Sequence, residues 1–294
     1  MRRHKNWIIV VAVLAVMAVA LVVLRSILAP HYYITQYADD TGIQAMFYTI
    51  ESDRGDLIVI DGGNAGNAYY VRSVIEEKGG HVDAWVLTHP HPDHIGAFNI
   101  LWDGMQDKID VIYASEIDYT AYYRKAQEWD DIASYDTFLN YMSESDKLVY
   151  LHTGDDLKIC GLRFKVLHSY EDFVDETSND ICNNGSLMLR VTNQKESMLF
   201  CGDIGVGMSE KIMSQFPEDI KCDYIQMGHH GNGGLSEAFY REAAPRAAFF
   251  DAPEWLMNPE EGKSYTTPAN RQLMESLGAE IYYFATAPNR IELN

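Results

Sequence analysis

The chain has few basic residues for its length. Among 294 residues, 23 Lys and Arg stand against 43 Asp and Glu, and the net charge is −20. Residues 1–29 hold four of the basic residues and no acid, so residues 30–294 carry 19 basic and 43 acidic residues, a net of −24. Non-specific binding to duplex DNA depends on basic residues that displace counterions, and an acidic body repels polyanions at long range. The composition disfavours a DNA-coating role and leaves open a local basic groove.

The sequence is also poor in cysteine, and none of its four cysteines forms a Cys-x-x-Cys pair. Cys160, Cys182, Cys201 and Cys222 allow three disulfide pairings, and the sequence does not choose among them. Cys201 lies within an apolar stretch, which predicts a buried free thiol there. No internal repeat or low-complexity segment follows residue 29.

One long apolar run is present near the start. Trp7 to Leu24 is an unbroken stretch of 18 apolar residues, preceded by Arg2, Arg3 and Lys5. This length reaches the threshold for a transmembrane helix, and the basic cluster predicts a cytoplasmic N-terminus. We therefore expect a cytoplasmic segment at 1–6, a single-pass signal-anchor helix at 7–29 and an extracytoplasmic body at the cell membrane. A cleaved signal peptide, which would make the body a secreted protein, is the alternative.

The body alternates short strand-like runs with helical runs. Residues 45–50 and 57–60 predict a hairpin, and residues 67–77 predict a helix that ends at Gly79 and Gly80. Residues 115–147, rich in Tyr, Trp and acids, have no strand pattern and read as a helical insertion. Further strands are predicted at 84–87, 111–113, 148–151, 157–159, 162–167, 186–192, 197–201, 224–227, 247–250, 281–284 and 290–293, and helices near 209–215, 236–242 and 268–277. Such a mixture predicts an α/β fold in which helices cover sheets.

The strongest chemical signal is the segment Thr88-His-Pro-His-Pro-Asp-His-Ile-Gly96, which directly follows an apolar strand. Imidazoles and a carboxylate are ligands that a divalent metal such as zinc prefers. His89 and His91 can converge on one metal, because alternate residues share a side. Asp93 and His94 can reach a second metal. The alternative, a His-rich surface turn, suits a single histidine better than three in six positions.

Three other predicted strands end in a polar group. Asp61 follows the strand at 57–60, Asp203 follows the strand at 197–201, and His229 and His230 follow the strand at 224–227. Each would have an ordinary structural explanation alone, as a turn residue or a helix cap. Together with the histidine segment they predict a site assembled from strand ends. One residue of the His229–His230 pair would bind metal and the other would face substrate.

This order of motifs resembles the metallo-β-lactamase superfamily. Val59-Ile-Asp-Gly-Gly63, Asn183-Asn-Gly-Ser-Leu187, Cys201-Gly-Asp-Ile204 and Gly228-His-His-Gly231 look like the C-terminal hydrolase domain of competence protein ComEC and related phosphorylcholine esterases. The resemblance covers residues 32–294. It implies a four-layer αββα sandwich with two divalent metals, usually zinc. The implied ligands are His89 and His91 for the first metal and Asp93, His94 and His229 for the second, with Asp203 as the bridge and Asp61 orienting a ligand histidine from beneath.

The sequence departs from many members of the superfamily at the first metal. A third histidine is usual before a Gly-Ser strand, but residues 179–186 contain none. Asn183 or Asn184 would lie near this metal as a weaker ligand, and His168 is a further candidate that is more easily explained as structural. The first site would therefore bind metal less tightly or accept manganese. The same departure argues against a true β-lactamase.

The function expected from these residues is phosphodiester hydrolysis by a metal-bridging hydroxide. Asp93 and His230 are the candidate catalytic groups, with His230 contacting substrate or protonating the leaving group. The expected substrate is a small-molecule or head-group phosphodiester, because the acidic body disfavours nucleic acid. The alternatives are hydrolysis of lactone, amide or thioester bonds, a nuclease of ComEC type, and a surface module that binds without catalysis.

Overall fold

The computed structural model describes residues 14–17, 29–39, 42–284 and 288–294. The chain divides into two compact units, residues 1–31 and 32–294. The predicted anchor at 7–29 falls outside the described residues, apart from residues 14–17, which are helical, and residue 29. Within the described part of the chain, no helix combines the length and the apolar character that a bilayer crossing needs.

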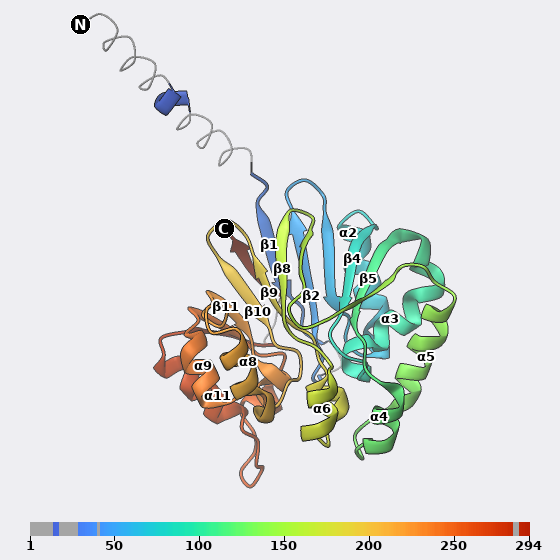
Figure 1. Ribbon diagram of the computed structural model, residues 1–294, viewed down its shortest axis with the longest axis vertical. Helices are drawn as coiled ribbons and strands as arrows, with labels where there is room; N and C mark the ends of the chain where they lie inside the picture. The colour runs from blue at the N-terminus through green and yellow to red at the C-terminus, as the bar shows by residue number, and fades with distance from the viewer. Residues whose placement is uncertain (1–13, 18–28, 40–41, 285–287) are drawn as a thin grey trace, which may run out of the picture. The chain divides into compact units, whose positions relative to one another are not determined.

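The larger unit is built on two seven-stranded sheets (Figure 1). The first has the order β14 (Asn289–Leu293), β1 (Tyr32–Gln36), β2 (Phe47–Ser52), β3 (Leu57–Asp61), β4 (Val82–Leu87), β5 (Ile109–Ser115) and β6 (Leu148–Leu151). The second has the order β13 (Glu280–Tyr282), β12 (Ala247–Phe249), β11 (Tyr224–Gln226), β10 (Ser197–Phe200), β9 (Met188–Thr192), β8 (Leu162–His168) and β7 (Asp156–Ile159). Both sheets are mixed: β3 to β6 and β10 to β13 run parallel, and the other pairs are antiparallel.

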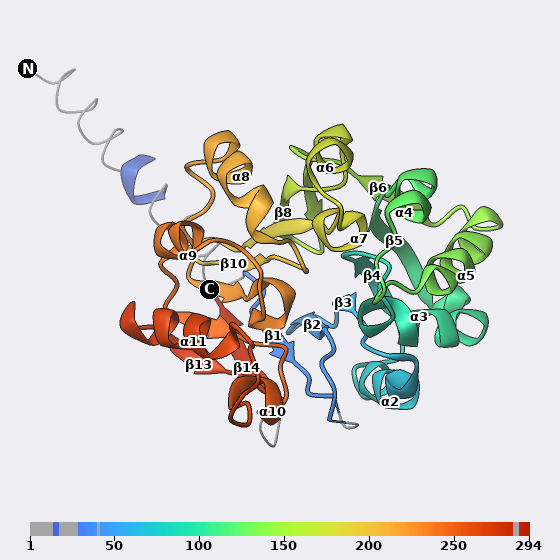
Figure 2. The ribbon, with the colours of Figure 1, turned by 90° about the horizontal axis from the view of Figure 1, so that it is seen from below.

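Helices cover the outer face of each sheet (Figures 1 and 2). The first sheet carries α2 (Ala68–Glu77), α3 (Pro92–Met105), α4 (Tyr119–Lys125) and α5 (Ile132–Ser143), and the second carries α8 (Ser209–Gln215), α9 (Glu237–Ala243), α10 (Glu254–Met257) and α11 (Thr267–Ser276). The short helices α6 (Asp172–Thr177) and α7 (Ile181–Asn184) lie between the two groups. The sandwich of two sheets expected from the sequence is confirmed, while α6, α7, α10 and strand β1 had no clear sequence signal.

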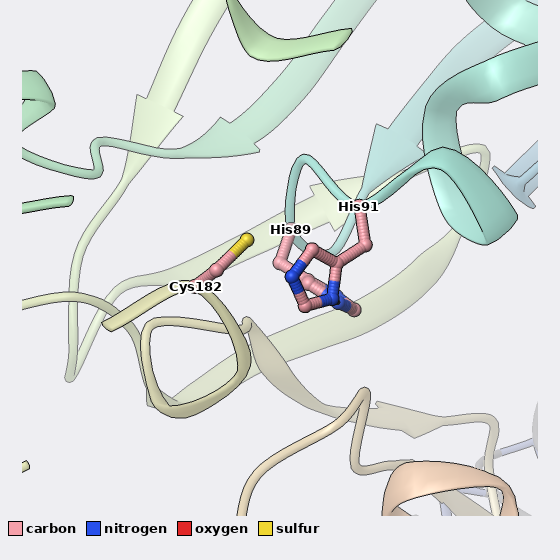
Figure 3. A group of neighbouring side chains, drawn as sticks. All are labelled: His89, His91 and Cys182. Atoms are coloured by element: carbon pink, nitrogen blue, oxygen red, sulfur yellow. The ribbon is translucent and has the colours of Figure 1, made fainter. Parts of the chain in front are cut away.

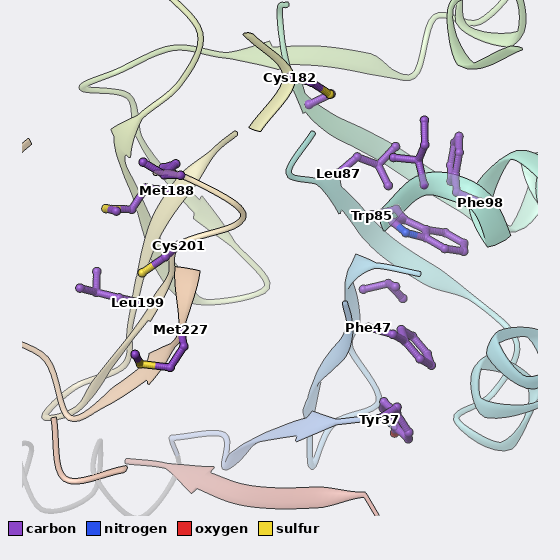
Figure 4. Packing of buried hydrophobic residues seen from close by; sticks show 14 of the residues in the cluster. Tyr37, Phe47, Trp85, Leu87, Phe98, Cys182, Met188, Leu199, Cys201 and Met227 are labelled. Carbon is purple, nitrogen blue, oxygen red and sulfur yellow. The ribbon is translucent and has the colours of Figure 1, made fainter. Parts of the chain in front are cut away.

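The central strands are buried on both faces, because one face of each sheet meets the other sheet and the opposite face meets helices, whereas the edge strands β6, β7, β13 and β14 are partly exposed. Along β3, Ile58 and Ile60 belong to the core between the sheets, whereas Val59 belongs to the core beneath the helices. Between the sheets, the Tyr48 ring meets the Phe200 ring edge-on at a centroid distance of 5.2 Å. Figure 4 shows side chains of the other core. A strand buried on both faces reads as a continuous apolar run, which is the pattern of β3 and β4.

All four cysteines are free in the described part of the chain. Cys201 is fully buried, which confirms the free thiol predicted at that position. Cys182 is also fully buried, in α7. No sequence pattern pointed to this second thiol as a neighbour of a functional group.

Candidate metal centre

The predicted site residues follow the carboxyl ends of four strands. Asp61 is the last residue of β3, the histidine segment follows β4, Asp203 follows β10, and the His229–His230 pair follows β11 in a 3-10 turn, η4 (Gly228–Gly231). Because β3 and β4 run parallel, as do β10 and β11, these ends meet at one edge of the sandwich.

The start of α3 divides the histidine segment into two parts. His91 is the residue before the helix and Pro92 is its first residue, a position that proline favours because its fixed φ suits the first turn and its missing N–H is not needed there. His89 and His91 therefore lie in the loop, while Asp93 and His94 lie in the first turn. The segment is held by backbone bonds from Gly62 N to His94 O at 2.8 Å and from Met46 N to Asp93 O at 3.0 Å.

In the first histidine pair, two ring nitrogens face each other. His89 Nε2 and His91 Nδ1 are 3.1 Å apart, and Figure 3 shows the two rings beside Cys182. His91 Nε2 donates to the Asp130 carboxylate at 2.6 Å, which leaves a lone pair on His91 Nδ1 in the neutral ring. His89 Nδ1 lies 3.3 Å from the Thr88 hydroxyl oxygen, whose own proton goes to Asp61 Oδ2, so the lone pair of neutral His89 is on Nε2. Two lone pairs at this separation repel, so either one of the two nitrogens carries a proton or a cation lies beside both.

A second group of donors lies beside the first. His230 Nε2 is 3.1 Å from Asp93 Oδ2 and 3.3 Å from Asp203 Oδ2, and His94 Nε2 is 3.4 Å from Asp203 Oδ1. In the described part of the chain, His94 Nε2, His230 Nε2 and Asp203 Oδ1 are fully buried, and the contacts of 3.1–3.4 Å among these groups do not have hydrogen-bond geometry. Unpaired buried polar atoms are costly, and a divalent cation would satisfy all three. Three residues, Asp93, His94 and His230, have donor atoms within 4.8 Å of one another, and so do His89, His94 and Asp203.

The pKa shifts of Asp203 and His230 also indicate a place for a cation in this group. Burial by itself raises the pKa of Asp203, but His230 and His94 outweigh it and hold that pKa well below its usual range. Burial lowers the pKa of His230, but Asp203 and Asp93 outweigh it and raise that pKa to about 10. In the metal-free chain, protons on the imidazoles thus neutralise the carboxylates. A bound cation would replace those protons.

Both histidines of the second group are oriented from behind. His94 Nδ1 is 2.7 Å from Asp61 Oδ2, and the same carboxylate accepts from Thr88 N at 2.7 Å. His230 Nδ1 is 3.1 Å from the backbone oxygen of Asp251. A ring N–H bonded to an acceptor leaves the other ring nitrogen free as a metal ligand. Asp61 therefore contacts the ring of His94 on the side away from Asp203, which is compatible with the orienting role that the resemblance implied.

His229 and His230 differ sharply in position. His230 is fully buried in the second group, whereas the His229 side chain is 35% exposed and its Nε2 lies 3.9 Å from Asp203 Oδ2. Both residues have positive φ, 53° and 55°, a conformation that costs energy for residues other than glycine and is concentrated at functional sites. The resemblance implied a metal ligand at His229 and a substrate group at His230, and the geometry favours the reverse.

The structure also distinguishes among the three weaker ligand candidates, Asn183, Asn184 and His168. Asn183 Oδ1 is buried without a hydrogen-bond partner among the described residues, and Asn183 lines the pocket over the centre. Asn184 is used structurally, since its Oδ1 accepts from Gly205 N at 2.9 Å. His168 Nε2 donates to the Asn184 backbone oxygen at 2.7 Å, and burial lowers its pKa to about 4. The structure brings neither Asn184 nor His168 into the groups of donor atoms.

The sequence reasoning missed Asp130 and Cys182. Asp130 lies 39 residues from His91, in a segment without a motif, so no local signal pointed to it. Cys182 has its sulfur within 4.8 Å of donor atoms of His89 and His91, and it stands in the segment where many relatives have a third histidine. An open pocket of about 320 Å³ lies over the centre and is lined by His91, Asp93, Asp203, His229 and the exposed Trp129, among others.

Comparisons with known proteins bear on the fold. The family model described as the Metallo-beta-lactamase superfamily matches residues 40–158. The ComE operon protein 3 of Bacillus subtilis (strain 168) is 30% identical over 175 residues, which is 58% of this chain and 20% of that protein. This chain therefore matches about one fifth of the length of that relative.

Two solved structures show the fold. The metallo-beta-lactamase fold protein YhfI from Bacillus subtilis has a TM-score of 0.56 and 14% identity, covering 89% of this chain and 99% of that chain. CmlA, a diiron beta-hydroxylase from Streptomyces venezuelae, has a TM-score of 0.54 and 12% identity, covering 90% of this chain and 55% of that chain. The chain has the metallo-β-lactamase fold, and the resemblance found in the sequence is confirmed at that level.

Proposed function

We propose that this chain is a dinuclear metal hydrolase that cleaves small phosphodiesters. The observation that carries the proposal is a cluster of buried ligand atoms that make no hydrogen bond of good geometry, namely His94 Nε2, His230 Nε2 and Asp203 Oδ1, beside the facing nitrogens of His89 and His91. In this proposal His89 and His91 hold the first metal, Asp93, His94 and His230 hold the second, and Asp203 lies between them. Zinc suits this imidazole and carboxylate set best, and manganese is the alternative.

Two divalent cations held in this way lower the pKa of water and offset the negative charge that develops on the substrate. The protein side chains supply position and proton transfer. Asp93 Oδ2 faces both the centre and the pocket, where it can orient the attacking water. His229 lines the same pocket and is partly exposed, so it can donate a proton to the leaving oxygen. His230 is buried behind His229 and would bind the second metal.

The pocket supports a small substrate over a polymer. Among the residues that the structure describes, no Lys or Arg lines it, so phosphate contacts would come from the metals, from His229 and from neutral amide side chains such as Gln44 and Asn64. Duplex binding depends on several basic contacts along the backbone, and the net charge of −24 on residues 30–294 adds repulsion. The exposed indole of Trp129 on the rim offers a face for a ring or a cationic head group. The ComEC-type nuclease is therefore the weaker alternative.

The topology remains part of the proposal. The apolar run at 7–24 and the basic residues before it support a single-pass anchor at 7–29 with the hydrolase domain outside the cytoplasm. Protease added to intact cells should digest the body of the chain. Digestion only after lysis would reverse the orientation.

Turnover tests the function. The full chain, loaded with Zn²⁺ or Mn²⁺, should hydrolyse a small activated phosphodiester faster than single-stranded DNA, by the widest margin at low salt, where repulsion of the polyanion is least screened. Asp203→Asn should abolish turnover, whereas His152→Ala, at an exposed histidine outside the centre, should leave it unchanged. Hydrolysis of a lactone, an amide or a thioester in place of the phosphodiester would establish the second enzymatic alternative. Faster cleavage of DNA would establish a nuclease, and metal binding without any turnover would favour a binding module.

A further inference from the structure

The connection between α4 and α5 contributes a carboxylate to the metal centre. The Asp130 side chain is fully buried, with Oδ1 2.6 Å from His91 Nε2. Its second oxygen, Oδ2, accepts from Gln127 N at 2.6 Å. The Gln127 side chain in turn donates to Lys125 O at 2.6 Å and to Asn179 O at 2.7 Å. Both oxygens of the carboxylate are thus held, and the loop that carries it is tied to α4 and to the segment before α7.

This contact determines which nitrogen of His91 faces the centre. A carboxylate only accepts hydrogen bonds, so His91 Nε2 carries the proton in the pair with Asp130. The lone pair of the neutral ring is then on Nδ1, the atom 3.1 Å from His89 Nε2. The opposite tautomer would place a proton on Nδ1 and remove His91 as a ligand. Bonding to a carboxylate also makes an imidazole a stronger donor to a metal.

The first metal position depends on its orienting carboxylate, Asp130, more than the second metal position depends on Asp61. In the described part of the chain, no third histidine joins His89 and His91, and the nearby side chain is the Cys182 thiol, whose pKa burial raises. Apart from the shared Asp203, the position therefore relies on two imidazoles, one of which, His91, is hydrogen-bonded to the Asp130 carboxylate. By contrast, the Asp61 carboxylate that orients His94 belongs to strand β3 itself.

We propose that Asp130 is a positioning residue for the first metal and that the α4–α5 insertion is part of the metal centre rather than a cover over it. The proposal rests on the two-metal centre proposed above, but not on the identity of the substrate. The alternative is that Asp130 only packs the insertion onto the domain. That alternative predicts a loss of stability when Asp130 is changed, with no selective loss of one metal.

Asp130→Asn is the informative change, because an amide has one acceptor oxygen and cannot accept from both His91 and Gln127. Asp131→Asn is the matched control. It removes the same charge one residue later, where the exposed carboxylate accepts from Ala133 N at 3.1 Å at the start of α5. Co²⁺ is the probe, since its visible absorption reports the ligands around each bound ion. The full chain and both variants are titrated with Co²⁺ in competition with a chelator, and the melting temperatures of the metal-free forms are compared.

We expect Asp130→Asn to bind one Co²⁺ about 10- to 100-fold more weakly, with an altered spectrum for that ion and unchanged affinity for the other. Asp131→Asn should match the parent chain. Unchanged affinity for both ions in Asp130→Asn, or an equal loss in Asp131→Asn, would overturn the proposal. If Asp130→Asn does not fold, ¹⁵N NMR of the parent chain loaded with Zn²⁺ decides. A proton on His91 Nε2 supports the proposal and a proton on Nδ1 refutes it.

A parent chain that binds no metal overturns this inference and the proposed function together. A parent chain that binds two ions but does not cleave phosphodiesters overturns only the proposed function. The two failures are therefore distinguishable in one set of preparations.

Discussion

Asp61→Asn offers a sharp perturbation of the second metal position, because Asp61 acts through His94 without facing the centre itself. The carboxylate accepts from Thr88 N at 2.7 Å, from the Thr88 hydroxyl at 2.6 Å and from His94 Nδ1 at 2.7 Å. Asp61 also has a φ of 53°, which Asn tolerates better than most residues. Substitution by Asn therefore changes the hydrogen bonding with little added backbone strain.

The magnitude follows from the bonds that an amide cannot keep. Its oxygen can still accept from Thr88 N, but its NH₂ group then faces His94 Nδ1, so the His94 ring must carry its proton on Nε2, the atom that lies 3.4 Å from Asp203 Oδ1. The loss of one buried bond to a charged acceptor costs about 2–3 kcal/mol of the free energy of unfolding. For a domain of this size that corresponds to a fall in melting temperature of about 4–12 °C. Affinity for the second metal should fall about 10- to 100-fold.

The assay combines calorimetry of the metal-free chain with a chelator competition, with Asp131→Asn as the control. Asp131 is an exposed carboxylate that accepts from Ala133 N at the start of α5, and an Asn side chain can still accept there, so this change should alter neither quantity. The reasoning would be refuted by an Asp61→Asn chain that melts as the parent does, or by one that is destabilised yet binds both metals with parental affinity.

Three further outcomes follow from the geometry. His230→Ala should lose one metal per chain, whereas His229→Ala should keep both metals and lose turnover. Elemental analysis beside a rate measurement distinguishes the two variants. The reverse pattern would restore His229 as the metal ligand, as the sequence implied. The metal-free chain should be most stable between about pH 4 and 6.5. The pKa of His230 is raised to about 10, so its contribution to stability is complete below the ordinary value of 6.5 and is lost as pH rises through 10, whereas the lowered pKa of Asp203 gives a contribution that is lost below pH 3.8. A melting temperature that rises steadily from pH 6.5 to pH 10 would contradict this prediction. Gly202→Ala should destabilise the chain by about 2–4 kcal/mol, since φ is +52° and the new Cβ would lie 2.8 Å from Ser186 Cβ; denaturant unfolding measures it, and a change under 1 kcal/mol would show that the turn adapts.

The sequence predicted those parts of the site that follow local patterns. The histidine segment, Asp61 and Asp203 each follow an apolar run, and such runs predict strands whose ends meet at one edge. The choice between His229 and His230 was not accessible, because it depends on two consecutive positive φ values rather than on residue type.

Long-range contacts were equally inaccessible to the sequence. Asp130 and Cys182 reach the centre from segments that are distant along the chain, and the sequence within those segments has no periodicity that points to the site. The aromatic residues of the insertion could not be sorted by sequence for the same reason: Tyr122 is fully buried, whereas Tyr123 and Trp129 are 65% and 61% exposed. Only Trp129 of these three lines the pocket over the centre.

The metal content of the full chain tests the central claim most directly. The chain is purified in detergent without chelators, dialysed against Zn²⁺ or Mn²⁺ and then against metal-free buffer, and analysed for bound elements. The donor groups around His89, His94 and His230 predict about two divalent ions per chain, falling to one or none in Asp203→Asn. A parent chain that retains no metal after exposure to both ions would contradict the account.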